Sequence, residues 1–416
     1  MADTTVLGYN ESQNVTIPPF GDATAFSLLV ADAISTSVSL GSYTQADGTT
    51  IPGPTVVGEA VAVSVGGAVN VGTGFGALLY TNNVAPLTIQ AAAGLDVLSG
   101  TGGITYYGAA NTVESDGVAS IYAGGGKNLV AFGAGAKYVV AFGDGSDTVY
   151  ASGSGLIDLG GGTNLMTVGQ GVNTVFASGT SDTIVAGSGS ATIGSGGNKA
   201  LIFTGTGNTF VAVGGTGSTV VAGAGAVTVF AGADSTTFLN NSGSPLFIAP
   251  GDASATVVGG TTAATVFGNA GSNITYFNAP NGAGALLIAG VGSEMLNAAG
   301  SNVANTMFAG SGRSTLLGGA GADLIVGSAG TGTLTGGAGA DQFIFSQGAA
   351  GGSFLITDFV KGADSVILSH YGAAEVASAI SGATVSGGAT SVALSDGTRI
   401  TFANVSAIDG SLFKVN

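Results

Sequence analysis

The sequence predicts an all-β fold, a parallel β-roll or β-solenoid with a β-rich N-terminal module and a C-terminal β cap. One observation is composition: 77 of the 416 residues are glycine and only 7% are charged. An ordinary globular domain has about 7% glycine and about 25% charged residues. Another is a repeat of about nine residues over much of the chain. Small residues at tight turns, with β-branched residues between them, suit coils that stack on one another.

Two copies of one nine-residue pattern stand in register at residues 318–326 and 336–344. We interpret each as a six-residue turn followed by a three-residue strand, because glycines permit positive φ and close backbone approach. Asp323 and Asp341 end the two turns, and the apolar residue two positions later is expected to point inward. Residues 327–335 form a degenerate copy, with Gly332 at the position of the aspartate.

This pattern, Gly-Gly-x-Gly-x-Asp-x-apolar-x, resembles the nonapeptide of the RTX (repeats-in-toxin) proteins, which wind into a calcium-binding parallel β-roll. In that family one coil contains two nonapeptides, so residues 18 apart stack in a column. The resemblance implies that Asp323 and Asp341 share a column and bind Ca²⁺. Further oxygen ligands are expected from one coil upstream and from backbone carbonyls, namely Asn305, Gly318, Gly321, Gly336 and Gly339.

The alternative is that each aspartate only closes a tight turn by accepting bonds from backbone amides. Asp147 and Asp182 also end near-matching turns, but neither has an acidic partner one coil away. Asp147 is retained as a possible metal position, although a hydrogen-bonded turn is the favoured interpretation for both. The opposite column contains Ser314 and Gly332, so we expect calcium on one edge only.

The chain is expected to divide into three parts. Residues 1–95 lack the nine-residue period and contain most of the prolines, which indicates a separate β-rich cap or assembly module. Residues 96–345 form the solenoid, degenerate upstream and calcium-binding at 300–345. Residues 346–416 form the C-terminal cap, because the open strand edges of a solenoid need covering.

A second resemblance lies at residues 356–369. This segment, Ile-Thr-Asp-Phe-Val-Lys-Gly-Ala-Asp-Ser-Val-Ile-Leu-Ser, is similar to the segment that closes the rolls of serralysin-related exported proteins. Residues 391–402 are predicted to form a hairpin around a Ser-Asp-Gly turn. The resemblance implies that the ending, residues 405–416, is an uncleaved signal for a type I secretion system and its ABC transporter.

Charge and composition exclude several partners. The net charge is −16 and no basic residue precedes Lys127, so nucleic acid and anionic membrane surfaces are poor partners. Without cysteine there are no disulfides or thiolate metal sites. The sequence has no recognisable N-terminal secretory signal and no apolar run long enough for a membrane helix.

We predict no enzymatic activity. His370 is the only histidine, and the His-Glu-x-x-His motif of zinc proteases is absent, so the serralysin resemblance carries no protease activity. The seven basic residues are scattered along the sequence. A polysaccharide-cleaving cluster would require Lys127 and Lys137 to converge with Asp147.

The leading functional hypothesis is a secreted calcium-binding structural protein that self-assembles into a surface layer, matrix fibre or sheath and folds on export. The alternative is a calcium-dependent adhesin that binds a glycan or another surface, and a polysaccharide-acting enzyme comes third. Ice binding is disfavoured because the threonines recur singly rather than as Thr-x-Thr, as at Thr174, Thr183, Thr192, Thr219 and Thr228.

Overall fold

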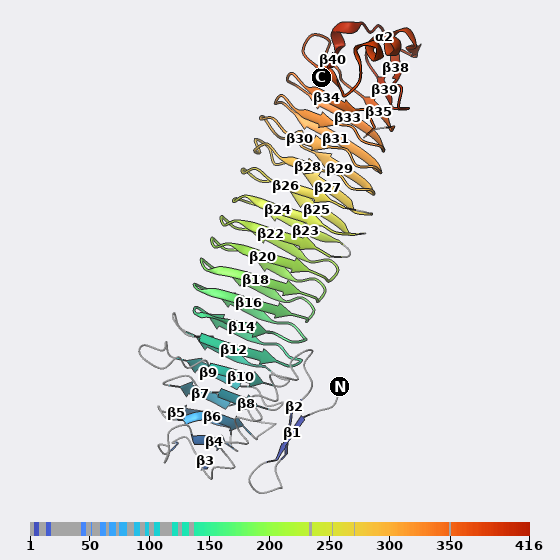
Figure 1. Cartoon of the computed structure of the whole chain (residues 1–416). Coiled ribbons are helices and arrows are strands. Elements are labelled where there is room, and N and C mark those ends of the chain that lie inside the picture. The colour runs from blue at the N-terminus through green and yellow to red at the C-terminus, as the bar shows by residue number, and fades with distance from the viewer. Residues whose placement is uncertain are drawn as a thin grey trace. The chain divides into compact units, whose positions relative to one another are not determined.

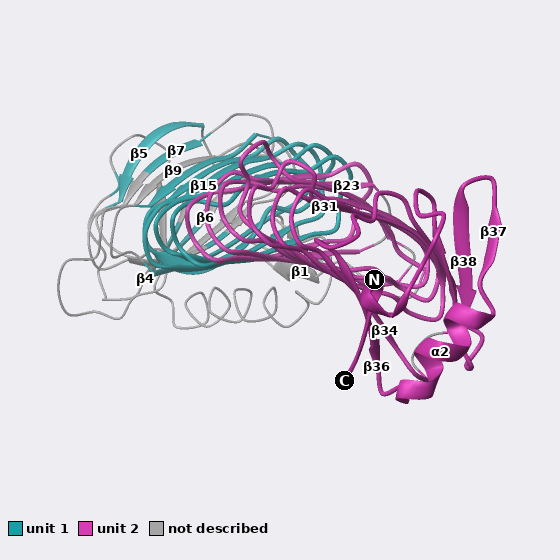
Figure 2. Cartoon of the chain, turned by 90° about the horizontal axis from the view of Figure 1, so that it is seen from above, with its two compact units in different colours: residues 1–210 teal, residues 211–416 magenta. Residues whose placement is uncertain are grey.

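The structure is a computed structural model of the whole chain, in which residues 137–232, 235–251, 253–269, 271–348 and 351–416 are described. Residues 51, 66 and 127–132 are also described. Elsewhere upstream of residue 127, the structure describes only strands, which lie between residues 4 and 123. The chain forms two compact units, Met1–Phe210 and Val211–Asn416 (Figure 2). Each unit is a stack of short strands that pair in parallel as two sheets (Figure 1).

From β4 onward, the even-numbered strands of unit 1 form one sheet, the even sheet, which β3 also joins, and the odd-numbered strands form the odd sheet. The even sheet contains β3 (Tyr43–Ala46), β4 (Glu59–Val63), β6 (Phe75–Tyr80), β8 (Asp96–Ser99), β10 (Ala119–Ala123), β12 (Lys137–Phe142), β14 (Ser154–Asp158), β16 (Val172–Ala177) and β18 (Ser190–Ser195). The odd sheet contains β5 (Gly67–Val71), β7 (Leu87–Ala91), β9 (Ile104–Gly108), β11 (Leu129–Phe132), β13 (Thr148–Ala151), β15 (Leu165–Val168), β17 (Thr183–Ala186) and β19 (Leu201–Phe203). Strands β1 (Thr4–Leu7) and β2 (Asn14–Ile17) pair antiparallel, and the boundary between the units falls within β20 (Thr209–Val213).

Unit 2 repeats this arrangement. Its even sheet contains β22 (Val227–Ala231), β24 (Pro245–Ala249), β26 (Thr265–Gly268), β28 (Leu286–Ile288), β30 (Thr306–Phe308), β32 (Leu324–Val326), β34 (Gln342–Ser346), β36 (Ser365–Ser369) and β40 (Phe413–Val415). Its odd sheet contains β21 (Thr219–Ala222), β23 (Thr236–Asn240), β25 (Ser254–Val258), β27 (Asn273–Phe277), β29 (Ser293–Asn297), β31 (Arg313–Gly319), β33 (Thr331–Gly337), β35 (Ser353–Ile356) and β39 (Arg399–Phe402).

The core of unit 2 consists of inward-facing columns of buried residues from both sheets. Alternate residues of each strand are buried, as the period of two in a strand requires. On the even sheet, Ile325 pairs with Phe343 in the next coil, and both are fully buried. These are the apolar residues that follow Asp323 and Asp341 by two positions, so the predicted inward orientation is confirmed. The all-β parallel β-roll fold is confirmed as well.

The predicted boundary near residue 95 does not coincide with a break in strand pairing. Strand β6 pairs in parallel with β8, and β7 pairs with β9, so the sheets continue across this boundary. The nine-residue period is absent here because the intervals vary: Glu59 aligns with Phe75, whereas Gly67 aligns with Leu87. Alternating buried residues such as Val61 and Val63 are sufficient for the pairing. A separate role for residues 1–95 remains a prediction.

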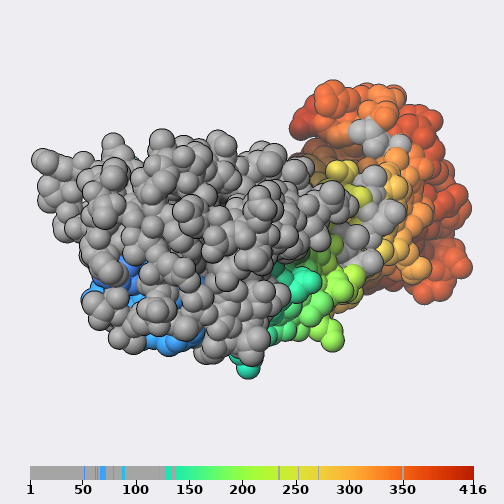
Figure 3. All heavy atoms as spheres, turned by 90° about the horizontal axis from the view of Figure 1, so that it is seen from below, coloured from blue at the N-terminus to red at the C-terminus, as the bar shows by residue number. Residues whose placement is uncertain are grey.

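The C-terminal segment, red in Figures 1 and 3, extends both sheets of unit 2. The predicted hairpin is present as β38 (Ala389–Ala393) and β39, with Gly397 at φ +88° in the turn. Strand β37 (Thr384–Ser386) pairs with β38, while β40 follows the short 3-10 helix η2 (Gly410–Leu412) and pairs with β36. The prediction of an all-β cap missed helix α2 (Ala373–Ser381), which forms because its alanine-rich sequence favours a helix.

Among the described residues, no helix has the length and apolar character needed to cross a bilayer.

Candidate metal centre

A column of polar side chains runs along one edge of the even sheet in unit 2, each residue directly preceding a strand. The Oδ1 atom of each accepts a hydrogen bond from a backbone amide one coil upstream. Asn305 accepts from Ala285 at 2.9 Å, and Asp323 accepts from Asn305 at 2.6 Å. Asp341 accepts from Asp323 at 2.8 Å, and Asp364 accepts from Asp341 at 2.9 Å. The predicted column of Asp323 and Asp341 is therefore present, and hydrogen bonds link it rung by rung.

The second carboxylate oxygen of two column residues has no partner. Asp323 and Asp341 are each 1% exposed, and the Oδ2 atom of each is buried without a hydrogen bond. An unpartnered buried oxygen on an ionised group is costly unless a counter-charge reaches it. The alternative of a purely hydrogen-bonded turn accounts for Oδ1 in each case and leaves Oδ2 unexplained.

The carboxyl groups of Asp323 and Asp341 also have raised pKa values. Burial raises the pKa of Asp341 to about 6. The hydrogen bond from the amide of Asp323 lowers this pKa, whereas the charges of Asp323, Asp364 and Asp358 raise it. Burial likewise raises the pKa of Asp323, while hydrogen bonds from Asn305 lower it. A bound cation would reverse this trend, because it favours the ionised form.

Two glycines leave space beside these unpartnered oxygens. A Cβ atom on Gly318 would lie 2.2 Å from the carbonyl oxygen of Gly336 and 2.3 Å from Oδ2 of Asp323. A Cβ atom on Gly336 would lie 2.3 Å from Oδ2 of Asp341. Neither glycine has a positive φ, so backbone angles do not require glycine here. Because both residues lack a side chain, these carboxylate and carbonyl oxygens can lie close to the place where a Cβ would stand.

This environment fits a calcium ion. Ca²⁺ takes six to eight oxygen ligands, and backbone carbonyls can supply many of them. Within the described part of the chain, no three acidic, histidine or cysteine side chains group together as a metal site. A cation between the coils would therefore use the carboxylates of Asp323 and Asp341 together with turn carbonyls. Among the predicted carbonyls, that of Gly336 borders Oδ2 of Asp323, and that of Gly321 lies 2.3 Å from the position of a Cβ on Gly339.

Asn305 has a different role from the one predicted. Its carbonyl oxygen Oδ1 accepts the bond from Ala285, and its Nδ2 donates to Oδ1 of Asp323 at 2.9 Å and to the carbonyl of Gly318 at 3.1 Å. An amide can donate and accept at once, which a carboxylate cannot. Asn305 therefore orients Asp323 and is not favoured as a calcium ligand.

Unit 1 contains a second column with the same hydrogen bonds. The Oδ1 atom of Asp147 accepts from the amide of Asn128 at 2.9 Å and from its Nδ2 at 2.7 Å. Asn164 follows, accepting from the amide of Asp147 at 3.0 Å, and Asp182 accepts from the amide of Asn164 at 2.9 Å. The Oδ2 atoms of Asp147 and Asp182 are also buried without a partner. Burial raises the pKa of Asp147 to about 6 and raises that of Asp182.

The two columns differ five residues before each aspartate. Unit 2 has Gly318 and Gly336 there, whereas unit 1 has Phe142 before Asp147 and Ala177 before Asp182. Phe142 is fully buried and Ala177 is 2% exposed. A glycine nevertheless borders a carboxylate in unit 1 too, since a Cβ on Gly179 would lie 2.9 Å from Oδ1 and 3.0 Å from Oδ2 of Asp182. Asn164 stands between Asp147 and Asp182 in this column, so Asp147 has no acidic neighbour one coil away. Its assignment as a possible metal position stays a prediction.

Sequence reasoning missed three carboxylates near these columns. Asp364 continues the unit 2 column, 23 residues after Asp341 rather than 18, because the chain makes an extra loop after β34. Asp358 accepts bonds from the amides of Gly336 at 3.0 Å and Gly337 at 2.8 Å. Both belong to the 356–369 segment, for which no metal role was predicted.

The third missed carboxylate, Glu294, lies in the opposite column, where it pairs with Ser314 of the next coil. It is 3% exposed, and its Oε1 accepts from the amide of Gly290 at 3.2 Å while its Oε2 has no partner. Residues 289–297 fit the nonapeptide except at two positions, where Ala289 replaces the first glycine and Glu294 replaces the aspartate.

The residues considered for catalysis do not form a site in the described part of the chain. Asp147 is buried within its column, whereas Lys137 is exposed. His370 is exposed, with its Nδ1 atom 3.0 Å from Oγ of Ser369.

Comparison with known families agrees with this geometry. The family model of the RTX calcium-binding nonapeptide repeat, in four copies, matches residues 158–193 and 300–334. These repeats and the parallel β-solenoid fit an RTX-type β-roll protein. The matched segments include Asp182 and Asp323, one from each column, and repeats of this family bind calcium ions. No curated protein matches the chain.

Proposed function

We propose that this RTX β-roll is a secreted structural protein that folds as it binds calcium outside the cell and then self-assembles into a layer, matrix fibre or sheath. The observation that carries the proposal is an uncharged apolar face on the even sheet of unit 2. It supports self-association because soluble monomers rarely expose long continuous apolar strips.

The face consists of two outward-pointing columns, which we call the apolar strip. All its members are partly exposed, and strand pairing aligns each with the next. One column contains Phe230, Ile248, Phe267, Ile288, Phe308, Val326, Ile344 and Ile367, and the other contains Thr228, Leu246, Thr265, Leu286, Thr306 and Leu324. No charged residue interrupts the strip over these coils.

A second copy of this chain is the occupant we assign to the strip. Successive strands lie about 4.8 Å apart, so the apolar strip is roughly 35–40 Å long and has an area on the order of 400–500 Å². Two copies would bury about 1,000 Å², which is the lower end for a specific interface. Both copies have the same row spacing, so their side chains can interdigitate row by row. Contacts of this size suit an assembly in which many weak interfaces act together.

Calcium is the expected trigger for folding and assembly. With a net charge of −16, the unliganded chain repels itself, and the column of Asp323, Asp341 and Asp364 concentrates acids inside unit 2. Calcium binds only folded turns, so its binding free energy adds to the stability of the coils. A chain that remains unfolded at low calcium can be threaded through a type I secretion transporter, consistent with the resemblance at residues 356–369.

Electron microscopy with negative stain tests the proposal. The chain is refolded from denaturant with calcium and in parallel with chelator, and we expect ordered filaments or layers with calcium alone. Ile288→Lys, at the centre of the strip, should leave single particles, because a buried lysine is costly. Met295→Lys on the odd sheet adds the same charge at a neighbouring strand and should still assemble. Single particles of the parent in calcium, or equal behaviour of both variants, would contradict the proposal.

A glycan adhesin is the second candidate. It is supported by an outward threonine column on the odd sheet of unit 2, in which Thr219, Thr237, Thr256 and Thr275 align in register. The threonines are single, since the next outward residue on β23 is Leu239. Rows of hydroxyl groups offer hydrogen bonds to sugars. Binding of purified protein to immobilised glycans, without assembly, would favour this candidate.

A further inference from the structure

The only two arginines of the chain lie in one outward column of the odd sheet in unit 2. Arg313 on β31 pairs with Thr331 on β33, which pairs with Ser353 on β35, which pairs with Arg399 on β39. Both arginines are exposed. They are 86 residues apart in sequence, but only three strand spacings, about 14 Å, separate their backbones.

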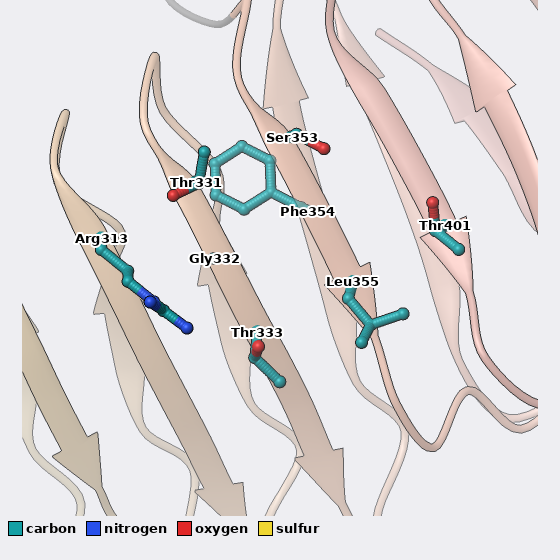
Figure 4. A pocket seen from close by; sticks show the side chains of 8 residues that line it. All are labelled: Arg313, Thr331, Gly332, Thr333, Ser353, Phe354, Leu355 and Thr401. Carbon is teal, nitrogen blue, oxygen red and sulfur yellow. The ribbon is translucent and has the colours of Figure 1, made fainter.

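A surface depression of about 320 Å³ lies beside this column. Figure 4 shows Arg313, Thr331, Ser353 and Thr401 on four successive strands around it. Hydroxyl groups of threonine and serine dominate the polar part of the lining, and no acidic residue is among the lining residues. Gly332 is also among the lining residues, next to the ring of Phe354, which is 1% exposed.

The charge of the column contrasts with the rest of the molecule. The chain has 23 acidic residues and seven basic ones, yet among the described residues neither Arg313 nor Arg399 forms an ion pair. An exposed guanidinium carries five donors in a planar fork that matches a carboxylate or a sulfate. The site therefore combines two anion-binding ends with hydroxyl groups between them.

The geometry points to a binding site for an acidic polysaccharide. An extended oligosaccharide lying across strands β31, β33, β35 and β39 would place one acidic group at Arg313 and another at Arg399. Its hydroxyl groups would meet Thr331, Ser353 and Thr333 between the two ends. A monosaccharide is too short to reach both arginines, so affinity depends on chain length. This site is on the sheet opposite the apolar strip, and its argument is independent of self-assembly.

Titration calorimetry of the full chain in calcium tests the site, with oligogalacturonates of one to six units as probes. Affinity should rise at least tenfold between the monomer and the hexamer, and maltohexaose, a neutral sugar of the same length, should not bind. Arg313→Gln and Arg399→Gln should each weaken hexamer binding about tenfold, as expected for one charge-assisted pair. Lys414→Gln, on the even sheet, removes the same charge and should have no effect.

Several results would overturn the assignment. Equal binding of maltohexaose would mean that the hydroxyl groups alone recognise a neutral glycan. Equal, arginine-dependent binding of a hexaglutamate peptide would identify a site for acidic peptides instead. Absence of binding by the hexamer, or unchanged affinity in both arginine variants with an intact circular dichroism spectrum, would also contradict it. None of these outcomes depends on whether the protein forms filaments.

Discussion

The two polar columns of this β-roll share one hydrogen-bonding scheme but differ in chemistry. In unit 1 acid and amide side chains alternate, as Asp147, Asn164 and Asp182. In unit 2 acids follow one another from Asp323 onward, and glycines leave space beside them. The comparison indicates that the turn aspartate is first a structural rung, in which Oδ1 binds the coil upstream. We predict that metal binding also requires consecutive acids, which in the described residues form the unit 2 column.

The alternating column explains how a repeat can lose its metal without losing its fold. Asn164 accepts through Oδ1 as an aspartate would, and its Nδ2 donates to the carbonyls of Leu159 at 3.1 Å and Gly161 at 3.2 Å. A side-chain amide in this position donates hydrogen bonds to the turn carbonyls, whose partner would otherwise be a cation. The coils of unit 1 are therefore expected to remain stacked without calcium.

The largest predicted effect concerns the acids of unit 2. Asp323→Asn combined with Asp341→Asn should abolish stabilisation by calcium, which at a thousandfold excess over Kd would be about 4 kcal/mol. Thermal unfolding with calcium and with chelator measures it. Asp147→Asn combined with Asp182→Asn is the matched control and should retain the full calcium response. A loss of the response in the control and not in the unit 2 variant would reverse our assignment.

A smaller effect is expected from closing the space beside Asp323. Gly318→Ala places a methyl group 2.3 Å from Oδ2 of Asp323 and 2.2 Å from the carbonyl oxygen of Gly336, so these oxygens must move away; the φ angle of Gly318 does not require glycine. Calcium affinity should fall roughly tenfold to a hundredfold, or about 1.4–2.8 kcal/mol. Calcium titration followed by intrinsic tyrosine fluorescence or calorimetry reports the change. Gly196→Ala, at a turn of unit 1 where the methyl group meets no atom within 4 Å, should leave affinity unchanged. Equal losses in both variants would mean that the space is not a metal position.

The smallest effect concerns pH and unit 1. Burial raises the pKa of Asp147 to about 6 from its ordinary value of 3.8. Between these two pH values the folded state therefore keeps a proton that the unfolded state has released. The resulting stability is fully present below pH 3.8 and is lost as pH rises through 6. Asp147→Asn should therefore stabilise the chain by about 2 kcal/mol at pH 7.5 relative to pH 4. Urea unfolding of the parent and the variant at both pH values, in chelator, measures this difference. An equal change in unfolding free energy at the two pH values would contradict the prediction.

Much of the fold follows from the sequence because a strict nonapeptide fixes the coil length. Asp323 and Asp341 are 18 residues apart, so their column was predictable, and it is confirmed. Asp364 was not assigned to the column because the loop after β34 lengthens the interval to 23 residues. The upstream strands β4 to β7 were not assigned to the solenoid because their intervals vary.

Side-chain roles were less predictable than columns. Whether Asn305 offers an oxygen to a metal or bonds to Ala285 depends on the orientation of one amide, which sequence does not specify. The same holds for Arg313 and Arg399, which were described as scattered along the sequence. Their alignment depends on the number of strands between them. That number is hard to predict because the strands and loops within residues 346–398 vary in length.

The most direct test of the account is hydrogen exchange of the full chain with calcium and with chelator, read peptide by peptide. We predict that calcium strongly protects amides within residues 300–345, including those of Asp323 and Asp341, while residues 137–186 exchange equally slowly in both conditions. Protection of residues 137–186 that depends on calcium as strongly as that of 300–345 would contradict the distinction between the two columns.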